Sequence, residues 1–316
     1  MTTRVLILSS IYDFAVDLVL HRLRENNITY LRLNREQLAD LRLSLDPATR
    51  TMNIRGLGIA SSLGPDLESV WYRSPIFLRN TAGGKLSLGD QLARSQWSAF
   101  LRSMMIFEDA RWMNHPGDIY KAEVKPYQLL VAAKCGFAIP ETVVGNDVEE
   151  IQRRFPTQVA IKSIDTVYLR EDADVLFTYT NIIPSERLSD LNLHQAPLIA
   201  QQPITPKTDI RVTVVGTSVF AYKILVNGEA ALGDWRLHKR EEIRYEPMVL
   251  APNVEERCIE LCSELKLSFG AIDLIDSDGK IIFIEINPTG EWAWLPGAEA
   301  TAGAAIAAWL GAKEIK

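Results

Sequence analysis

Cysteine is scarce in this sequence, with three residues among 316. No two of them form a Cys-x-x-Cys pair, so their spacing argues against both a disulfide framework and a zinc site. Cys135 ends one predicted helix, and Cys258 and Cys262 lie on the apolar stripe of another. We therefore expect all three to be small buried core residues.

The sequence also lacks an excess of positive charge and any long apolar run. Its 34 lysine and arginine residues are outnumbered by 40 aspartate and glutamate residues, which gives a net charge of −6. This balance argues against nucleic acid or an anionic membrane as a partner. No apolar run approaches the ~20 residues that span a bilayer, and the first residues do not have the pattern of a signal peptide. A cytoplasmic protein is expected.

Two nucleotide-binding fingerprints are missing as well. Predicted strands at 5–8 and 29–33 flank a predicted helix at 13–24, which indicates an open α/β domain. No Gly-x-Gly-x-x-Gly turn follows the first strand, so a dinucleotide-binding domain is not predicted. The segment 82–87 contains Gly-Gly-Lys, but its spacing does not match the Walker pattern of a P-loop.

Proline and glycine mark a boundary at 114–117, where Asn-His-Pro-Gly follows a predicted helix at 90–107. Beyond this point, a helix is predicted from Lys125-Pro126 to the residue before Gly136, with proline in its first turn and glycine after its last. Strands and a short helix follow, and the segment 160–225 is mostly strand-like. We expect an α/β (α+β) protein with three parts, at 1–115, 116–200 and 201–316.

The most informative motif is the pair Glu285 and Asn287 at the end of an apolar run. Their spacing of two residues points both side chains to one face of a strand. A second apolar run carries Asp273, and Asp-Ser-Asp-Gly at 276–279 predicts the turn of a hairpin between the two runs. A three-residue loop at 277–279 would bring Asp273 to the face of Glu285, whereas a two-residue turn at 278–279 would move it to the opposite face. The sequence favours the three-residue loop, because it leaves one face entirely apolar, with Ile272, Leu274, Ile282, Ile284 and Ile286.

Three side chains with oxygen donors indicate a site for a hard cation. Because no histidine or cysteine is nearby, magnesium or manganese is favoured over zinc. Magnesium usually keeps coordination positions that phosphate oxygens fill, so the site predicts a nucleoside triphosphate. In the alternative interpretation, Asp273 is a strand-edge charge, Glu285 a salt-bridge partner and Asn287 a turn residue.

Phosphate binding by an acidic protein requires cations that converge from separate segments. Lys125 begins a predicted helix, and Lys162 ends an apolar strand. Arg211 follows Asp209 at a spacing of two, so we expect Asp209 to share its face and to orient either Arg211 or the ribose. In the alternative interpretation, the lysines are solvated and the Asp-x-Arg pair is a surface ion pair that contributes ~0–1 kcal/mol.

These residues, taken in order along the chain, resemble the ATP-grasp ligases. In that family two lysines contact phosphates, a hinge holds adenine, and an Asp…Glu-x-Asn set holds magnesium. A closer resemblance, over nearly the whole chain, is to the microviridin-type peptide maturases, which join side chains of a ribosomally made precursor peptide into ω-ester or ω-amide macrocycles (graspetides). The segments that carry it are Val-Trp-Tyr-Arg at 70–73, 209–216, Asp-Trp-Arg at 234–236, 269–274 and Glu-Ile-Asn-Pro-Thr-Gly-Glu-Trp at 285–292.

The resemblance implies an ATP-grasp fold in residues 116–200 and 201–316, preceded by an N-terminal open α/β (pre-ATP-grasp) domain in residues 1–115. It implies ATP and Mg²⁺ (or Mn²⁺) as cofactors, a precursor peptide with leader and core segments as partner, and a homodimer. Arg211 would stabilise the transferring phosphoryl group, and Arg236 would grip the substrate carboxylate or, alternatively, stack on Trp235 as a structural residue. The implied nucleotide-binding residues are Lys125, Lys162, Gln201, Gln202, Ile204 and Asp209, and the implied metal ligands are Asp273, Glu285 and Asn287.

The expected reaction uses ATP to convert an Asp or Glu side chain of the peptide to an acyl phosphate, which a Ser or Thr hydroxyl or a Lys amine then attacks. Two other functions agree with the sequence: a ligase that adds a free amino acid to a peptide or small acid, and an ATP-binding regulatory protein without turnover. The chain departs from the family pattern at Gln202, Lys223 and Glu291, which bears on peptide specificity more than on activity. The sequence does not identify the precursor peptide, the ring pattern, the type of bond or the leader-binding residues.

Overall fold

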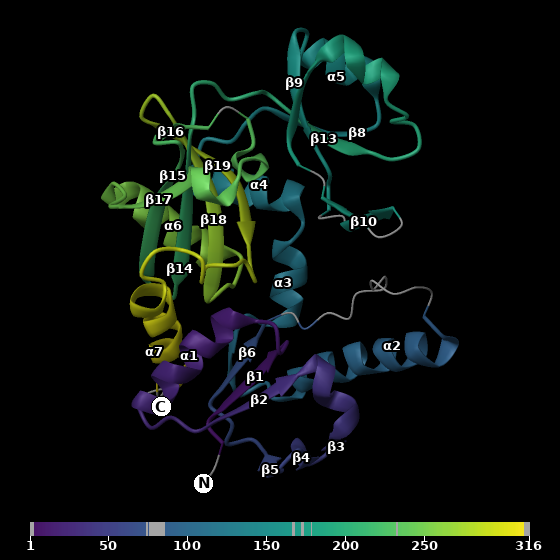
Figure 1. Ribbon diagram of the computed structural model, residues 1–316, viewed down its shortest axis with the longest axis vertical. Helices are drawn as coiled ribbons and strands as arrows, with labels where there is room; N and C mark the ends of the chain where they lie inside the picture. The colour runs from purple at the N-terminus through teal and green to yellow at the C-terminus, as the bar shows by residue number, and fades with distance from the viewer. Residues whose placement is uncertain are drawn as a thin grey trace.

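The structure is a computed structural model that describes residues 3–73, 75, 86–165, 168–171, 174–177, 179–231 and 233–312. The Gly-Gly-Lys sequence at 83–85 lies outside these residues. Figure 1 shows three groups of elements stacked along the long axis, with both termini in the lower part of the view. Among the described residues, no helix combines the length and the hydropathy required to cross a membrane.

The N-terminal group is built on a parallel sheet with the strand order β2-β1-β6-β7. The sheet is buried on both faces, which explains why β1 is a continuous apolar run rather than an alternating one. The predicted β-α-β opening is confirmed. The elements are β1 (Val5–Ser9), α1 (Phe14–Glu25), β2 (Tyr30–Asn34), η1 (Arg35–Asp40), β6 (Ser69–Tyr72), α2 (Leu88–Arg102), η2 (Ser103–Ile106) and β7 (Arg111–Met113), with an added meander of β3 (Arg42–Asp46), β4 (Thr51–Gly56) and β5 (Ile59–Leu63).

The group at the top of Figure 1 is a small antiparallel sheet with the strand order β12-β9-β13-β8. Its strands are β8 (Thr142–Gly145), β9 (Gln158–Lys162), β12 (Asn181–Pro184) and β13 (Leu198–Gln201), and a separate hairpin consists of β10 (Tyr168–Glu171) and β11 (Asp174–Phe177). Helix α5 (Val148–Arg154) and η3 (Ser185–Asp190) pack on it through Ile151 and Leu188. Because Gln201 is paired with Ala160, the register places Gln201 and Lys162 on the same face.

The third group is an antiparallel sheet with the order β16-β15-β14-β18-β19, in which β17 also pairs with β15. Its strands are β14 (Thr208–Val215), β15 (Ser218–Val226), β16 (Glu229–Ala230), β17 (Ile243–Met248), β18 (Phe269–Ser277) and β19 (Lys280–Asn287). Helices α4 (Lys125–Lys134) and α6 (Pro252–Glu264) cover one face, where all three cysteines are buried and unpaired, as expected. Helix α3 (Pro116–Ala122) precedes α4, and short η4 (Trp235–Leu237) and η5 (Arg240–Glu242) lie before β17.

The other face of this sheet packs against the N-terminal group. A π-helical turn (Glu299–Gly303) and α7 (Ala304–Gly311) lie between the sheet and α1, and one hydrophobic cluster joins residues of α1, α7, β14 and β18. Polar contacts add to this junction: the Ser69 hydroxyl donates to the carbonyl of Leu310 at 2.8 Å, and Arg111 donates to the carbonyl of Trp309 at 2.7 Å. The end of the chain therefore completes the core that the first residues begin.

The hairpin of β18 and β19 differs from the prediction at its turn. Ser277 pairs with Lys280, so the turn is the two-residue Asp278-Gly279, and both residues have positive φ (51° and 84°), as in a type I′ turn. The predicted three-residue loop is therefore wrong. A β-bulge then shifts the register, so that Leu274 faces Phe283 while Asp273 faces Glu285.

The bulge also changes the predicted apolar face. Ile284 is the extra residue, and it lines the pocket together with Glu285, whereas Phe283 and Ile286 are fully buried in the core beneath the sheet. Ile284 was predicted on the opposite face. A two-residue turn without the bulge would place Asp273 and Glu285 on opposite faces of the hairpin. With the bulge they share one face, as predicted, and lie directly opposite each other.

Candidate active site

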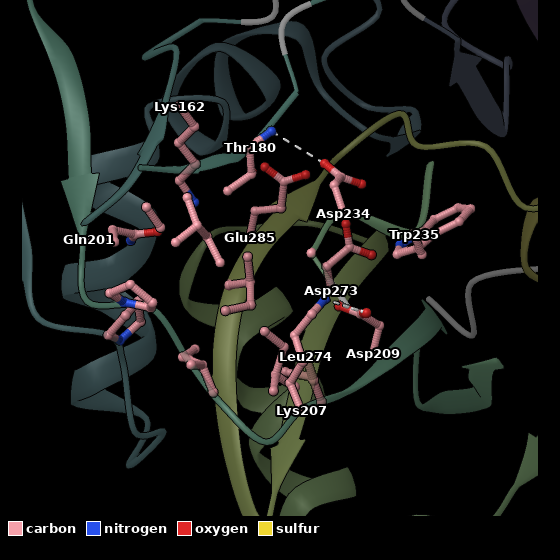
Figure 2. Close-up of a pocket in the computed structure, with 18 of the residues that line it drawn as sticks. Lys162, Thr180, Gln201, Lys207, Asp209, Asp234, Trp235, Asp273, Leu274 and Glu285 are labelled. Carbon is pink, nitrogen blue, oxygen red and sulfur yellow. Dashed lines mark hydrogen bonds and ion pairs between the residues drawn. The ribbon is translucent and has the colours of Figure 1, made fainter. Parts of the chain in front are cut away.

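A pocket lies between the small antiparallel sheet and the strands β14, β18 and β19. Figure 2 shows Lys162 and Gln201 on one side of it and Glu285, Asp273 and Asp209 on the other. The space among its lining side chains is about 890 Å³, including open solvent at the mouth. Apolar side chains line the part between these charged groups, namely Ala160, Ile204, Ile210, Leu274 and Ile284.

Two carboxylates form the centre of the charged region. Glu285 and Asp273 face each other across the hairpin, and the Asn287 amide lies 3.4 Å from a Glu285 oxygen. The three predicted metal ligands are thus brought together, and this donor set of two carboxylates and an amide oxygen fits Mg²⁺ or Mn²⁺. The described residues contain no group of three or more His, Cys, Asp or Glu side chains suited to a metal, so this site relies on the Asn287 amide as its third donor.

Cations surround these carboxylates. The Lys125 ammonium lies 2.7 Å from Glu285, at the first residue of α4. Burial acts to raise the pKa of Glu285, but Lys125 and Lys162 outweigh it and hold that pKa well below its usual range. Burial lowers the pKa of Lys162 to about 8, although Glu285 partly opposes the shift. The pKa of Asp273 is raised by burial, against the attraction of Arg211.

Arg211 is paired differently from the prediction. It lies directly opposite Asp273 on the neighbouring strand, and its Nη1 donates to Asp273 at 2.7 Å. Its Nη2 donates to the backbone carbonyl of Glu291 at 2.9 Å. Asp209 instead accepts from Lys207 at 2.6 Å, so the expectation that Asp209 orients Arg211 is wrong, and its position near the ribose stays a prediction. Lys207 lines the pocket and was not predicted.

Arg236 lines the pocket and contacts both an acidic and an aromatic side chain. It donates from Nε and Nη2 to the two oxygens of buried Asp234, at 2.9 and 3.1 Å. Its guanidinium also lies 5.9 Å from the ring centroid of Trp235. Trp235 and Tyr245 both contact Trp294, so an aromatic wall adjoins the two arginines of the site.

The predicted hinge residues line the pocket at the end opposite Arg236. Gln201 is buried and donates from its amide to the hydroxyl of Thr142 at 3.0 Å. Gln202 and Ile204 also line the pocket, and the Gln202 backbone N–H donates to the carbonyl of Glu141. This end offers apolar side chains and backbone groups, which suits an adenine ring.

Two buried amide side chains, Gln128 and Asn114, hold the segment with the proposed metal ligands in place. No sequence motif singled them out. Gln128 of α4 donates to the carbonyls of Ala122 and Ile286 and accepts from the Ile286 N–H. Asn114 donates to the carbonyls of Phe269 and Pro288 at 2.8 Å and accepts from two backbone N–H groups. Both connect segments more than 150 residues apart, and local sequence carries no signal of such contacts.

No protein-family model and no curated protein matches the chain. Several solved structures are similar over nearly the full length. A Chryseobacterium gregarium RiPP-associated ATP-grasp ligase, in complex with ADP and a leader and core peptide, is 28% identical with a TM-score of 0.85, covering 98% of this chain and 96% of that chain.

Two further structures have the same fold at lower identity. The macrocyclase MdnC of Microcystis aeruginosa, bound with precursor peptide MdnA, is 22% identical with a TM-score of 0.83, covering 97% of this chain and 98% of that chain. The ATP-grasp ligase PsnB, complexed with a minimal precursor, is 20% identical with a TM-score of 0.78, covering 98% and 99%. The chain therefore has the fold of the RiPP-associated ATP-grasp ligases, and the resemblance found in the sequence is confirmed.

Proposed function

We propose that the protein is an ATP-dependent peptide ligase that converts Asp or Glu side chains of a ribosomally made precursor peptide to acyl phosphates and closes ω-ester or ω-amide rings. One observation carries the proposal: a single pocket has a charged part lined by Lys162, Arg236, Asp273 and Glu285 and an apolar end lined by the predicted hinge residues. A ligase of the same fold, 28% identical, was solved with ADP and a leader and core peptide.

In this proposal Gln201, Gln202 and Ile204 hold the adenine, and Asp209 lies near the ribose. Lys125 and Lys162 neutralise phosphate charge. Asp273, Glu285 and Asn287 hold Mg²⁺, which when bound neutralises charge on the phosphate oxygens. In the structure Lys125 is paired with Glu285, so binding of Mg²⁺ to that carboxylate would free the Lys125 ammonium for the phosphates.

Arg211 and Arg236 act on the peptide carboxylate that becomes the acyl phosphate. Arg211 is 7% exposed and is fixed at two points, so its guanidinium can stabilise developing negative charge without reorganising. Arg236 is fixed by two hydrogen bonds that it donates to Asp234, and it grips the carboxylate from the pocket side. The acyl phosphate and the attacking hydroxyl or amine belong to the same peptide and are held in one cleft, so the ring-closing step is intramolecular. Most of its acceleration then comes from holding the two groups close together.

We also propose the division into an N-terminal domain at 1–115 and ATP-grasp subdomains at 116–200 and 201–316. The protein would act in the cytoplasm as a homodimer. Its net charge of −6 favours a peptide over a nucleic acid as partner.

The function is tested by incubating the protein with Mg-ATP and a candidate precursor peptide that carries Ser, Thr or Lys together with Asp or Glu. Ring closure lowers the peptide mass by one water for each bond and releases one ADP. A mass gain equal to an amino acid would instead identify a ligase for free amino acids, and nucleotide binding without ADP release would identify a non-catalytic protein. Glu285→Gln, assayed at limiting Mg²⁺, serves as the impaired control, and Glu256→Gln, on the exposed surface of α6, serves as the active one.

A further inference from the structure

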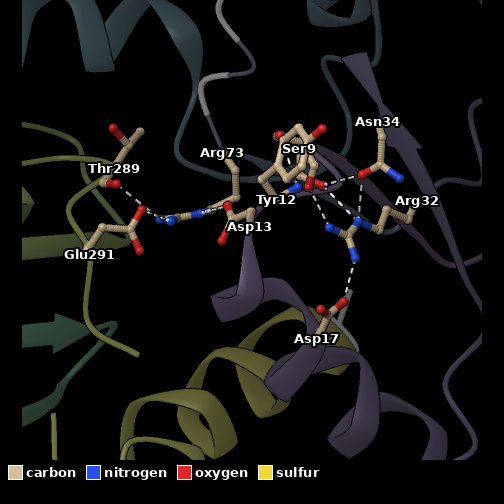
Figure 3. Close-up of polar contacts among 10 residues, drawn as sticks. Ser9, Tyr12, Asp13, Asp17, Arg32, Asn34, Arg73, Thr289 and Glu291 are labelled. Atoms are coloured by element: carbon tan, nitrogen blue, oxygen red, sulfur yellow. Dashed lines mark hydrogen bonds and ion pairs between the residues drawn. The ribbon is translucent and has the colours of Figure 1, made fainter. Parts of the chain in front are cut away.

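A buried arginine connects the N-terminal sheet to the segment that follows the proposed metal ligands. Arg73, whose side chain is 3% exposed, donates from Nε to Asp13 at 2.9 Å and from Nη2 to Glu291 at 3.0 Å (Figure 3). Its Nη1 donates to the backbone carbonyl of Thr289 at 3.1 Å. One guanidinium thus holds residues from both ends of the chain.

This cluster carries one positive and two negative charges, which leaves a net charge of −1. The neighbouring arginines do not offset it in the described part of the chain, because Arg211 is paired with Asp273 and Arg32 with Asp17. The second oxygen of Asp13 is buried, and the described residues offer it no hydrogen-bond donor. The Glu291 side chain is 63% exposed, so its charge faces solvent and any ligand that approaches from that side.

The excess charge lies beside the proposed reaction centre but outside the nucleotide pocket. The Arg211 guanidinium donates from one terminal nitrogen to the Glu291 carbonyl and from the other to Asp273. This one guanidinium therefore lies between the Glu291 backbone and the pocket. Asp273 and Arg236 line that pocket, whereas Glu291 is not among its lining residues. A nucleophile that approaches an acyl phosphate held by Arg211 from the side away from the nucleotide would therefore meet Glu291.

We propose that Glu291, supported by Asp13 and Arg73, selects a lysine ammonium as the acceptor, so that this protein forms ω-amide bonds in preference to ω-esters. A carboxylate attracts an ammonium but gains little from a neutral Ser or Thr hydroxyl. The inference rests on the proposed function and specifies its substrate class.

The chemical step balances as follows. The ammonium gives one proton to Glu291, which returns it to solvent, and the free amine attacks the acyl carbon. A C–N bond forms and the C–O bond to the phosphate breaks. The second proton from nitrogen leaves with the phosphate, so the products are the amide, hydrogen phosphate and one proton.

The test uses two forms of one candidate precursor peptide, one with Lys and one with Thr as the single acceptor, and measures kcat/KM for ring closure by mass spectrometry. The wild-type protein should favour the Lys form. Glu291→Gln keeps the acceptor atom for Arg73 and removes the charge, so it should lower the Lys-to-Thr ratio roughly two- to fivefold, the factor carried by one partly exposed ion pair. Glu256→Gln, which removes an exposed charge on α6, should leave the ratio unchanged.

The possible failures are distinguishable. If Glu291→Gln slows both peptides equally, or if the wild-type protein favours the Thr form, the inference is wrong and the proposed function stands. If the wild-type protein closes no ring with either peptide, the proposed function fails and the inference with it. Asp13→Asn gives a second variant of the same cluster, and its Lys-to-Thr ratio should move in the same direction by a smaller factor, because Asp13 lies farther from solvent.

Discussion

Gln128 should determine both the stability of the β19 edge and the position of the proposed metal ligands. Strand β19 is the last strand of its sheet, so the N–H and C=O groups on its outer side need partners from outside the sheet. Gln128, which is 3% exposed, supplies both partners to Ile286, the residue between Glu285 and Asn287, and also binds the Ala122 carbonyl. Its side-chain amide thus replaces one residue of a neighbouring strand.

The substitution Gln128→Met keeps the length of the side chain and removes the amide. Three backbone groups then lose their partner: the carbonyls of Ala122 and Ile286 and the N–H of Ile286. An unpaired buried polar group costs about 1–3 kcal/mol, so the loss of three partners should lower the free energy of unfolding by roughly 3–9 kcal/mol. The fall should lie near the lower value if water reaches the strand. Activity should fall as well, because Glu285 and Asn287 flank the released residue.

The assay is denaturant unfolding combined with hydrogen exchange of the peptide that contains Ile286. Gln152→Met is the matched control, since Gln152 lies on a helix and gives a single short hydrogen bond to a backbone carbonyl, that of Ser185 at 3.0 Å. We expect the control to lose about 1 kcal/mol and to keep the protection of Ile286. If the two variants are equally stable, or if Ile286 exchanges at the wild-type rate in Gln128→Met, the reasoning about the strand edge is refuted.

Three other predictions concern the charges of the pocket. The pKa of Lys162 is lowered to about 8, and the ammonium form present below that pH attracts phosphate, so ADP should bind more weakly as pH rises above about 8. Calorimetry should show that the affinity of Lys162→Met for ADP does not change with pH in this range. An affinity of the wild-type protein that is equally independent of pH would contradict the placement of Lys162 at the phosphates. Glu285→Gln should raise the Mg²⁺ concentration required for ADP production about tenfold or more, measured in a coupled assay, whereas an unchanged Mg²⁺ requirement would remove Glu285 from the metal site. Arg211→Lys keeps the charge, but a lysine cannot bridge Asp273 and the Glu291 carbonyl. We expect kcat to fall about 10²- to 10³-fold with little change in the KM for ATP. A change confined to the KM for ATP would instead show that Arg211 binds the nucleotide.

The hairpin shows how far the sequence could predict this site. The apolar runs and the Asp-Gly pair predicted two strands and a tight turn, and both are present. The turn length was wrong because four consecutive apolar residues at 281–284 give no alternation from which to read a face. A bulge inside such a run changes which residues point inward without changing the composition, so only the structure could place Ile284 in the pocket.

The charges of the site show a second limit. Sequence spacing selected Lys125, Lys162, Arg211 and the hairpin carboxylates, because each lies at the end of, or on one face of, a regular element, and the structure brings these side chains close together. Their partners could not be predicted in the same way. Arg211 faces Asp273, which is 62 positions away, rather than its near neighbour Asp209, since cross-strand pairing and not local spacing sets the contact.

The junction of α7 with α1 has a consequence for how this protein is made. The inward residues of α1, among them Val16, Val19 and Leu23, are fully buried in a cluster that also contains Ile306, Ala307 and Leu310. During synthesis α1 leaves the ribosome long before the residues of α7 that cover its apolar face are translated. Until residues 306–310 have been made, α1 therefore keeps an exposed apolar surface, so a chain that stops before α7 should aggregate rather than give a folded fragment.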